Sequence, residues 1–170
     1  MAIDKILVPV DFSPCSDAAL DYALAVADEC GAEVELLYVW SPRERKTPIP
    51  TGEPADDVDA EEGPTSAIFA ETPEGVAMER RLTEAEWKHA ARVSGRLEFG
   101  VEASSVILDI LEHERFDLVV MGREGEGHRH DRHDGESKHE SGHVAASVAK
   151  TTACKVVTRP PPPPDETEAA

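Results

Sequence analysis

The chain has 170 residues, 40% of them hydrophobic, which is enough to bury the core of one domain without disulfides. Its formal net charge of −18 argues against nucleic acids and anionic membranes as direct partners, because that charge repels phosphate groups. An acidic excess with little lysine is typical of proteins that stay hydrated in concentrated salt, so we expect a salt-adapted source.

The amino-terminal stretch MAIDKILVPV lacks the charged segment and long apolar run of a signal peptide, and no window reaches the roughly 18 apolar residues of a membrane span. We therefore expect a cytoplasmic protein. The three cysteines, Cys15, Cys30 and Cys154, are far apart and lack metal-type spacing, so we expect free thiols without a catalytic role.

The first predicted elements are a strand, a helix and a second strand. Residues 3–12 form an apolar run typical of a strand buried on both faces. A helix capped by Ser13 or Ser16 is expected to run until Gly31. Residues 32–40 give the second strand, and the short joints favour a right-handed crossover between parallel strands.

The middle of the chain changes in composition. Residues 41–73 are rich in proline, glycine and acids, which predicts a mobile connection, so we expect deletion of residues 44–70 to leave the melting temperature nearly unchanged. A helix with one apolar face is predicted over residues 74–94, with Gly95 as its end.

The remaining elements continue the alternation. They are a strand, a helix, a strand, a helix and a strand, over residues 96–103, 104–116, 116–122, 143–152 and 154–159. The acidic tail, residues 161–170, is predicted to be disordered. We thus predict one domain over residues 1–160, an α/β fold with three α/β/α layers around a five-stranded parallel sheet.

Ligands of such sheets bind beyond the carboxyl ends of the strands, where the strand order reverses. The residues at those ends are Asp11 after the first strand, Val39 and Trp40 after the second, and Met121 and Gly122 after the fourth. We expect these positions to line a cleft.

Three stretches, ILVPVDFSPCSDAALDYALAVA, DLVVMGREG and GHVAASVAKTTACKVV, resemble the universal stress protein family over residues 2 to 159. The resemblance implies a Rossmann-like fold of the adenine nucleotide alpha hydrolase type. It also implies a regulatory or protective role in stress and a bound ATP or AMP, with or without Mg²⁺. Catalysis beyond a slow ATPase is not expected.

The family's nucleotide-binding branch carries two glycines separated by two residues, then nine residues, a third glycine and a serine or threonine. Gly122 and Gly125 match the first two. Glycines let the backbone approach phosphates, so valine at either position is expected to abolish nucleotide binding. Counting nine residues past Gly125 gives Gly135 as the third glycine. The helix predicted over residues 143–152 favours Gly142 instead, with sixteen residues between it and Gly125.

In that register His143 replaces the hydroxyl residue, and its ring or amide is expected to contact phosphate. Asp11 is expected to accept hydrogen bonds from the ribose or base, or to cap the following helix. The resemblance implies a nucleotide site made of Pro9, Val10, Asp11, Val39, Met121, Gly122, Arg123, Gly125, Gly142, His143 and Val144.

The loop over residues 126–141 suggests a different chemistry. It carries four histidines that are candidate ligands for zinc, nickel or copper, His128, His130, His133 and His139. Acidic residues between them favour instead a mobile solvated loop whose histidines titrate near neutral pH. The alternative function is therefore a nucleotide-free dimeric interaction module that binds a transition metal through this loop.

The last strand is short and apolar, and such a strand at a sheet edge pairs readily with its copy across a two-fold axis. The resemblance implies a homodimer with Val156 and Val157 at the contact. An unidentified protein client is a further expected partner.

Overall fold

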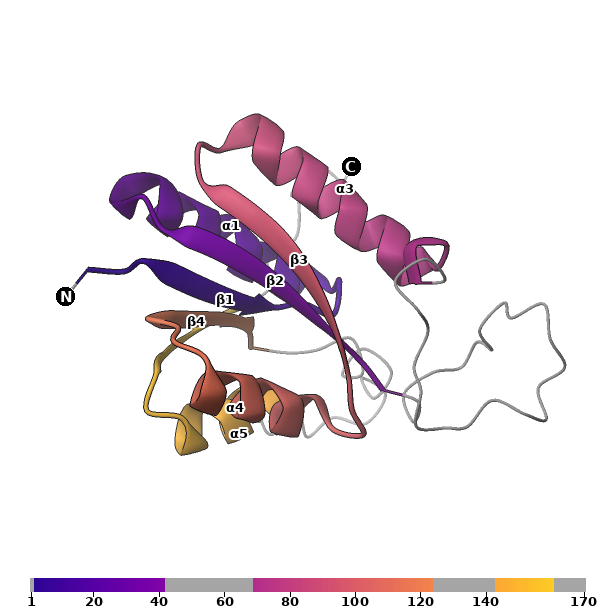
Figure 1. Ribbon diagram of the computed structural model, residues 1–170, viewed down its shortest axis with the longest axis vertical. Coiled ribbons are helices and arrows are strands. Elements are labelled where there is room, and N and C mark those ends of the chain that lie inside the picture. Colours follow the sequence, from indigo (N-terminus) through magenta and orange to yellow (C-terminus); the bar gives the residue numbers. More distant parts are fainter. Residues whose placement is uncertain (1, 42–68, 124–142, 161–170) are drawn as a thin grey trace, which may run out of the picture.

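The computed structural model describes residues 2–41, 69–123 and 143–160 (Figure 1). Within these ranges one sheet of five parallel strands has the order β3-β2-β1-β4-β5. Its members are β1 (Lys5–Pro9), β2 (Glu33–Trp40), β3 (Arg92–Phe99), β4 (Leu118–Gly122) and β5 (Lys155–Arg159). The strand order reverses between β1 and β4. The predicted parallel sheet is confirmed.

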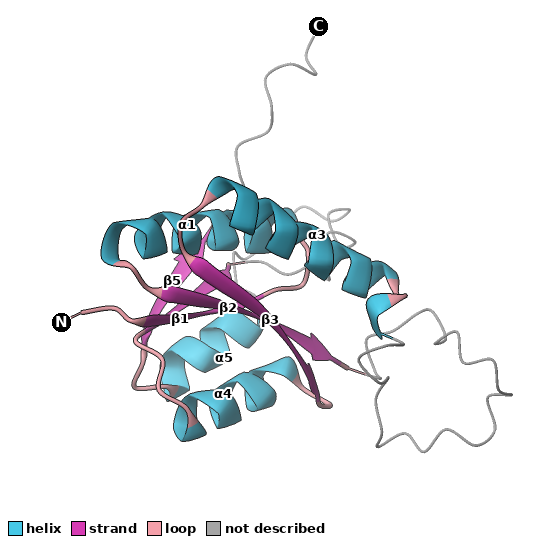
Figure 2. Cartoon of the chain, turned by 45° about the horizontal axis from the view of Figure 1, so that its top comes forward, coloured by secondary structure: helices cyan, strands magenta, loops and turns pink. Residues whose placement is uncertain are grey.

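Helices cover both faces of this sheet (Figures 1 and 2). On one face lie α1 (Pro14–Cys30) and α3 (Pro73–Lys88), and on the other α4 (Ala103–His113) and α5 (His143–Thr151). The predicted three-layer α/β/α arrangement is therefore confirmed.

The core is divided by the sheet because successive side chains of a strand point to opposite faces. In β1, Ile6 and Val8 pack in the cluster under α1, whereas Leu7 packs in the cluster under α4 and α5. All three are 0% exposed. The central strand is thus buried on both sides, as its apolar run predicts.

Helix α1 begins and ends as its sequence indicates. The Ser13 side chain is the cap and accepts a hydrogen bond from the amide of Ser16 at 3.3 Å. At the other end Gly31 has a φ of 75°, a left-handed conformation in which glycine avoids the Cβ strain.

The boundary between α3 and β3 corrects two predictions. The helix ends at Lys88, not at Gly95, and Gly95 lies inside β3. The cause is Asp28 on α1: its carboxylate pairs with the His89 ring at 2.6 Å and accepts the amide of Ala90 at 2.9 Å. These contacts follow a helix that ends six residues before its predicted last residue, and they hold the pKa of Asp28 below its ordinary value.

The glycine itself has a packing role. A Cβ on Gly95 would stand 2.9 Å from Leu82 Cδ1, so its absence lets α3 lie close to β3. The predicted third strand, residues 96–103, is accordingly shifted, because Arg92–Phe99 form β3 and Ala103 already belongs to α4.

The end of the predicted mobile connection is packed, which is a further correction. Phe69 is 8% exposed and Thr72 is 0% exposed. Thr72 caps α3 by accepting the amide of Gly75 at 3.0 Å, and its hydroxyl donates to the Phe69 carbonyl at 2.7 Å. The structure describes no part of residues 42–68, so the prediction for them lies outside the described residues.

Candidate functional site

The candidate site begins where β1 ends. Val10 is 6% exposed and donates its amide to the Leu37 carbonyl at 2.9 Å, which keeps the chain beside β2. Asp11 follows and is half-buried. Its Oδ1 accepts the amide of Ser13 at 3.0 Å. Asp11 therefore supports the start of α1 through Ser13, while Ser13 is the cap residue itself.

The residue between them, Phe12, has a φ of 62°, in the left-handed region that a bulky side chain rarely adopts. Such a conformation costs of order 1–3 kcal/mol and persists only where its surroundings hold it. The Phe12 ring stacks on Tyr38 of β2 with centroids 5.1 Å apart. Tyr38 in turn stacks on Phe69 at 5.5 Å. The turn that presents Asp11 is thus held from β2.

An apolar wall lies on the α4 and α5 side of the same sheet edge. Met121, at 4% exposure, belongs to the second core cluster, and Val39 and Val144 pack against that cluster. Pro9 is half-buried at the end of β1. The structure therefore brings the predicted residues of β2, β4 and α5 into one apolar cluster at this edge.

Gly122 stands at the end of β4, against the first turn of α1. A Cβ there would lie 2.9 Å from Cys15 Cβ and 3.0 Å from the Ser16 amide nitrogen. Real Cβ atoms do not approach so closely in well-packed proteins. The close approach of α1 thus requires a residue without a Cβ here, a packing role that the sequence motif does not indicate.

The structure describes only some of the remaining predicted site residues. The amide of Arg123 donates to the Arg159 carbonyl at 2.8 Å, which extends the pairing of β4 with β5. His143 is the exposed first residue of α5. The other glycines considered for the phosphate-binding pattern, Gly125, Gly135 and Gly142, lie outside the described residues.

The candidate metal ligands His128, His130, His133 and His139 also lie outside the described residues. Among residues 2–41, 69–123 and 143–160, no group of three or more His, Cys, Asp or Glu side chains is arranged to hold a metal ion. Within the same ranges no helix combines the length and apolar character of a membrane span.

Two cavities are found among the described residues, and neither is lined by the residues predicted to form a cleft, Asp11, Val39, Trp40, Met121 and Gly122. One, of about 320 Å³, lies between α1 and α3 and is lined by Asp17, Arg81 and other charged side chains. The other, of about 620 Å³, lies beside β3 and α4 and is lined in part by Phe99, Val101 and Val106. The second is more apolar, since Phe99 and Val101 are 39% and 52% exposed.

Sequence reasoning missed one side chain that contacts the Asp11 turn. Arg81 of α3 pairs with Asp17 of α1, with Nε 2.6 Å from Oδ1, although the two residues are 64 positions apart. Its guanidinium also lies 4.9 Å from the centre of the Phe12 ring. Local periodicity gives no signal for such a contact, because it depends on how α3 packs beside α1.

The comparisons with known proteins agree with this architecture. The model of the universal stress protein family matches residues 2–159. A comparison with curated protein sequences finds no match.

Several solved structures share the fold. Universal stress protein UspA from Lactobacillus plantarum has a TM-score of 0.68 at 24% identity, over 94% of this chain and 99% of its own. A universal stress protein in complex with cAMP has a TM-score of 0.60 at 18% identity, over 92% and 96%. One from Archaeoglobus fulgidus in complex with dAMP has a TM-score of 0.55 at 17% identity, over 92% and 98%.

Proposed function

The chain belongs to the universal stress protein family, and on that premise we propose that it binds an adenine nucleotide, ATP or AMP, in a regulatory or protective role under stress. Two proteins of the same fold were solved with cAMP and dAMP, which supports an adenine nucleotide as the ligand class. We assign no catalytic residue to it.

The position of Asp11 carries the proposal: it follows β1 at the carboxyl end of the sheet, where the strand order reverses between β1 and β4. On the α4 and α5 face of the sheet, Val39 and Val144 pack against the apolar cluster that contains Met121. In open parallel sheets ligands bind at this place. A carboxylate next to an apolar surface matches a nucleoside, whose ribose hydroxyls donate hydrogen bonds and whose base is flat and largely apolar.

The phosphates would extend toward α5. His143 opens that helix, and its amide and ring are donors for phosphate oxygens. Mg²⁺ on a triphosphate would offset the repulsion expected from a chain of net charge −18. AMP carries less negative charge than ATP, so its binding should depend less on Mg²⁺.

Thermal denaturation with AMP or ATP tests this function. Ligand that binds only the folded protein should raise the free energy of unfolding by about 2.7 kcal/mol at one hundred times its dissociation constant. ATP should be measured with and without Mg²⁺. If neither nucleotide shifts the melting curve at millimolar concentration, the proposal is wrong and the interaction module replaces it.

Asp11→Asn provides the specific control. Asparagine keeps an oxygen acceptor for the Ser13 amide, so the turn is preserved while the charge is lost. We expect AMP to bind about 10- to 100-fold more weakly, as for loss of a hydrogen bond to a charged group. An AMP analogue without the ribose 2′ and 3′ hydroxyls should bind both proteins equally. If Asp11→Asn still prefers AMP to this analogue as strongly as the unmodified protein does, residues other than Asp11 recognise the ribose.

A second proposal concerns assembly. Among the described strands β5 is at an edge of the sheet and pairs with β4 alone. Its Val156 and Val157 are only half-buried. We propose that β5 meets its copy across a two-fold axis, which would bury both valines further and pair the free backbone groups of the edge.

Analytical ultracentrifugation tests the dimer directly. At micromolar concentration the mass should be twice 18.4 kDa, and high salt should strengthen the dimer because it screens two acidic protomers from each other. A mass of one chain in both low and high salt would rule out this interface. This assembly is compatible with either function, so the nucleotide experiment decides between them.

A further inference from the structure

The turn that carries Asp11 needs support from outside itself. Phe12 holds a left-handed φ of 62° directly after Asp11. Within the turn, the Asp11–Ser13 and Ser13–Ser16 hydrogen bonds, at 3.0 and 3.3 Å, fix the carboxylate to the start of α1. The Asp11–Ser13 bond spans Phe12, so a change in the backbone conformation of Phe12 would turn the Ser13 amide away from the carboxylate.

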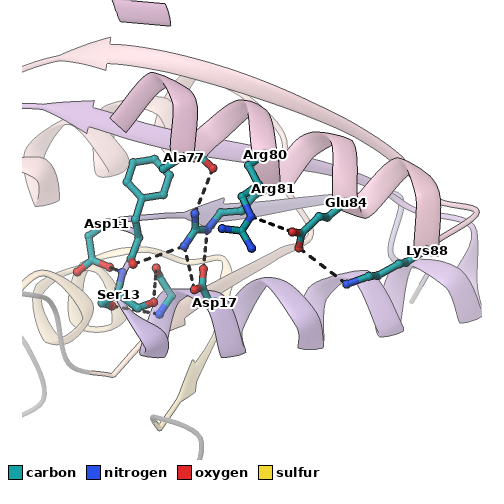
Figure 3. Close-up of polar contacts among 10 residues, drawn as sticks. Asp11, Ser13, Asp17, Ala77, Arg80, Arg81, Glu84 and Lys88 are labelled. Carbon is teal, nitrogen blue, oxygen red and sulfur yellow. Dashed lines mark hydrogen bonds and ion pairs between the residues drawn. The ribbon is translucent and has the colours of Figure 1, made fainter. Parts of the chain in front are cut away.

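Arg81 of α3 supplies this support (Figure 3). Its guanidinium lies 4.9 Å from the Phe12 ring centre, and one nitrogen donates to the Phe12 carbonyl at 3.5 Å. The guanidinium therefore contacts Phe12 twice: it stacks on the ring and donates a hydrogen bond to the backbone carbonyl. The Phe12 ring thus contacts both Arg81 and Tyr38.

Arg81 is itself held in place. It binds the Asp17 carboxylate through two nitrogens, at 2.6 and 2.9 Å, and donates to the Ala77 carbonyl at 3.1 Å. Its side chain is 18% exposed. A largely buried guanidinium that binds one carboxylate through two nitrogens is held in a single orientation, whereas a lysine on the surface is not.

The neighbouring Arg80 offers the contrast. It lies on the same helix, pairs with Glu84 four residues on at 3.0 Å, and its side chain is 76% exposed. Its ion pair with Glu84 stays within α3, as Figure 3 shows. The two arginines therefore differ in their connection to the turn and not in chemistry.

We propose that Arg81 is a positioning residue for the Asp11 carboxylate, so that the docking of α3 sets the affinity for nucleotide. The inference rests on the proposed function in one respect, namely that Asp11 contacts the ligand. It adds that a residue of α3, remote from the ligand, controls that contact through Phe12. By linkage, nucleotide should also strengthen the docking of α3 on α1.

The first arm of the test needs no ligand. Amide hydrogen exchange at Ser13 and Ser16, measured by nuclear magnetic resonance, reports the two hydrogen bonds of the turn. Arg81→Ala should speed exchange at both by ~10-fold or more relative to amides of β1, because local opening becomes easier. Arg80→Ala should leave both unchanged. Unchanged exchange in Arg81→Ala would overturn the proposal whether or not nucleotide binds.

The second arm measures AMP affinity. Arg81→Ala should weaken binding by ~10-fold, since a shift of about 1 Å in a binding group has effects of this size or larger. Arg81→Lys should recover only part of the loss, because lysine cannot form the bidentate pair. Adding Arg81→Ala to Asp11→Asn should cost nothing further, which is the mark of an effect exerted through Asp11.

The possible results distinguish a failure of the positioning role from a failure of the proposed function. Arg81→Ala could weaken AMP binding by the same factor in the unmodified protein and in Asp11→Asn. Its effect would then not be exerted through Asp11, which would overturn the positioning role. No AMP binding by the unmodified protein would reject the proposed function, while the exchange arm would still decide what Arg81 does to the turn. If Arg81→Ala does not fold, Asp17→Ala removes both hydrogen bonds of this pairing from the α1 side.

Discussion

Replacing Phe69 with alanine is expected to lower the free energy of unfolding by about 3–5 kcal/mol, the usual cost of deleting a buried phenyl group. The side chain is 8% exposed and lies between two aromatic rings. Its ring centroid is 5.5 Å from that of Tyr38 and 6.3 Å from that of Trp40. Alanine would leave both rings without their neighbour and open a cavity beside β2.

Urea denaturation followed by circular dichroism measures this loss. Trp87→Ala is the matched control, because it deletes an aromatic side chain that is 86% exposed and should change the stability by no more than about 0.5 kcal/mol. A loss in Phe69→Ala as small as in this control would show that the aromatic contacts are not formed. Because Phe69 is buried, deletion of residues 44–70 is now expected to lower the melting temperature, contrary to the expectation from the sequence.

Valine at Gly122 is expected to lower the stability by about 1–3 kcal/mol, through overpacking against α1. The new Cβ would lie within 3.0 Å of the Ser16 amide nitrogen, a backbone atom that cannot rotate away. The first turn of α1 must then move, and with it Ser13 and the turn at Asp11. A lost nucleotide response in this variant would thus not by itself demonstrate a phosphate contact.

Gly31→Ala separates packing from backbone strain. Gly31 has a φ of +75° and open space around its missing Cβ, so alanine there costs only the strain, roughly 1–2 kcal/mol. It lies at the far end of α1 and should leave nucleotide binding intact. Melting curves with and without AMP distinguish the two variants. A Gly122→Val protein as stable as the unmodified one would contradict the close approach of β4 to α1.

Much of the fold was predictable because the chain alternates between apolar runs and amphipathic segments. The run KILVP of β1 is buried on both sides, and LVVMG of β4 is its neighbour, as a parallel sheet requires. The edge that carries Asp11, Val39 and Met121 follows from the strand order alone. These are features that periodicity and turn residues encode locally.

The failures share one cause, which is that they depend on contacts between distant segments. Helix α3 ends at Lys88 because Asp28, on another helix, satisfies the amides that follow. Phe69 is buried although its neighbours in sequence read as a linker. Arg81 contacts Phe12 only because α3 packs beside α1. Propensity and composition carry no information on such pairs.

The central position of β1 has a consequence for synthesis on the ribosome. This strand emerges first, yet one of its two neighbours begins at Leu118, and the register pairs Leu7 with Val119. At roughly 5–20 residues per second, one edge of β1 waits on the order of ten seconds for its partner. An apolar strand with an open edge pairs readily with other nascent chains. The newly made protein should therefore need a chaperone during that interval.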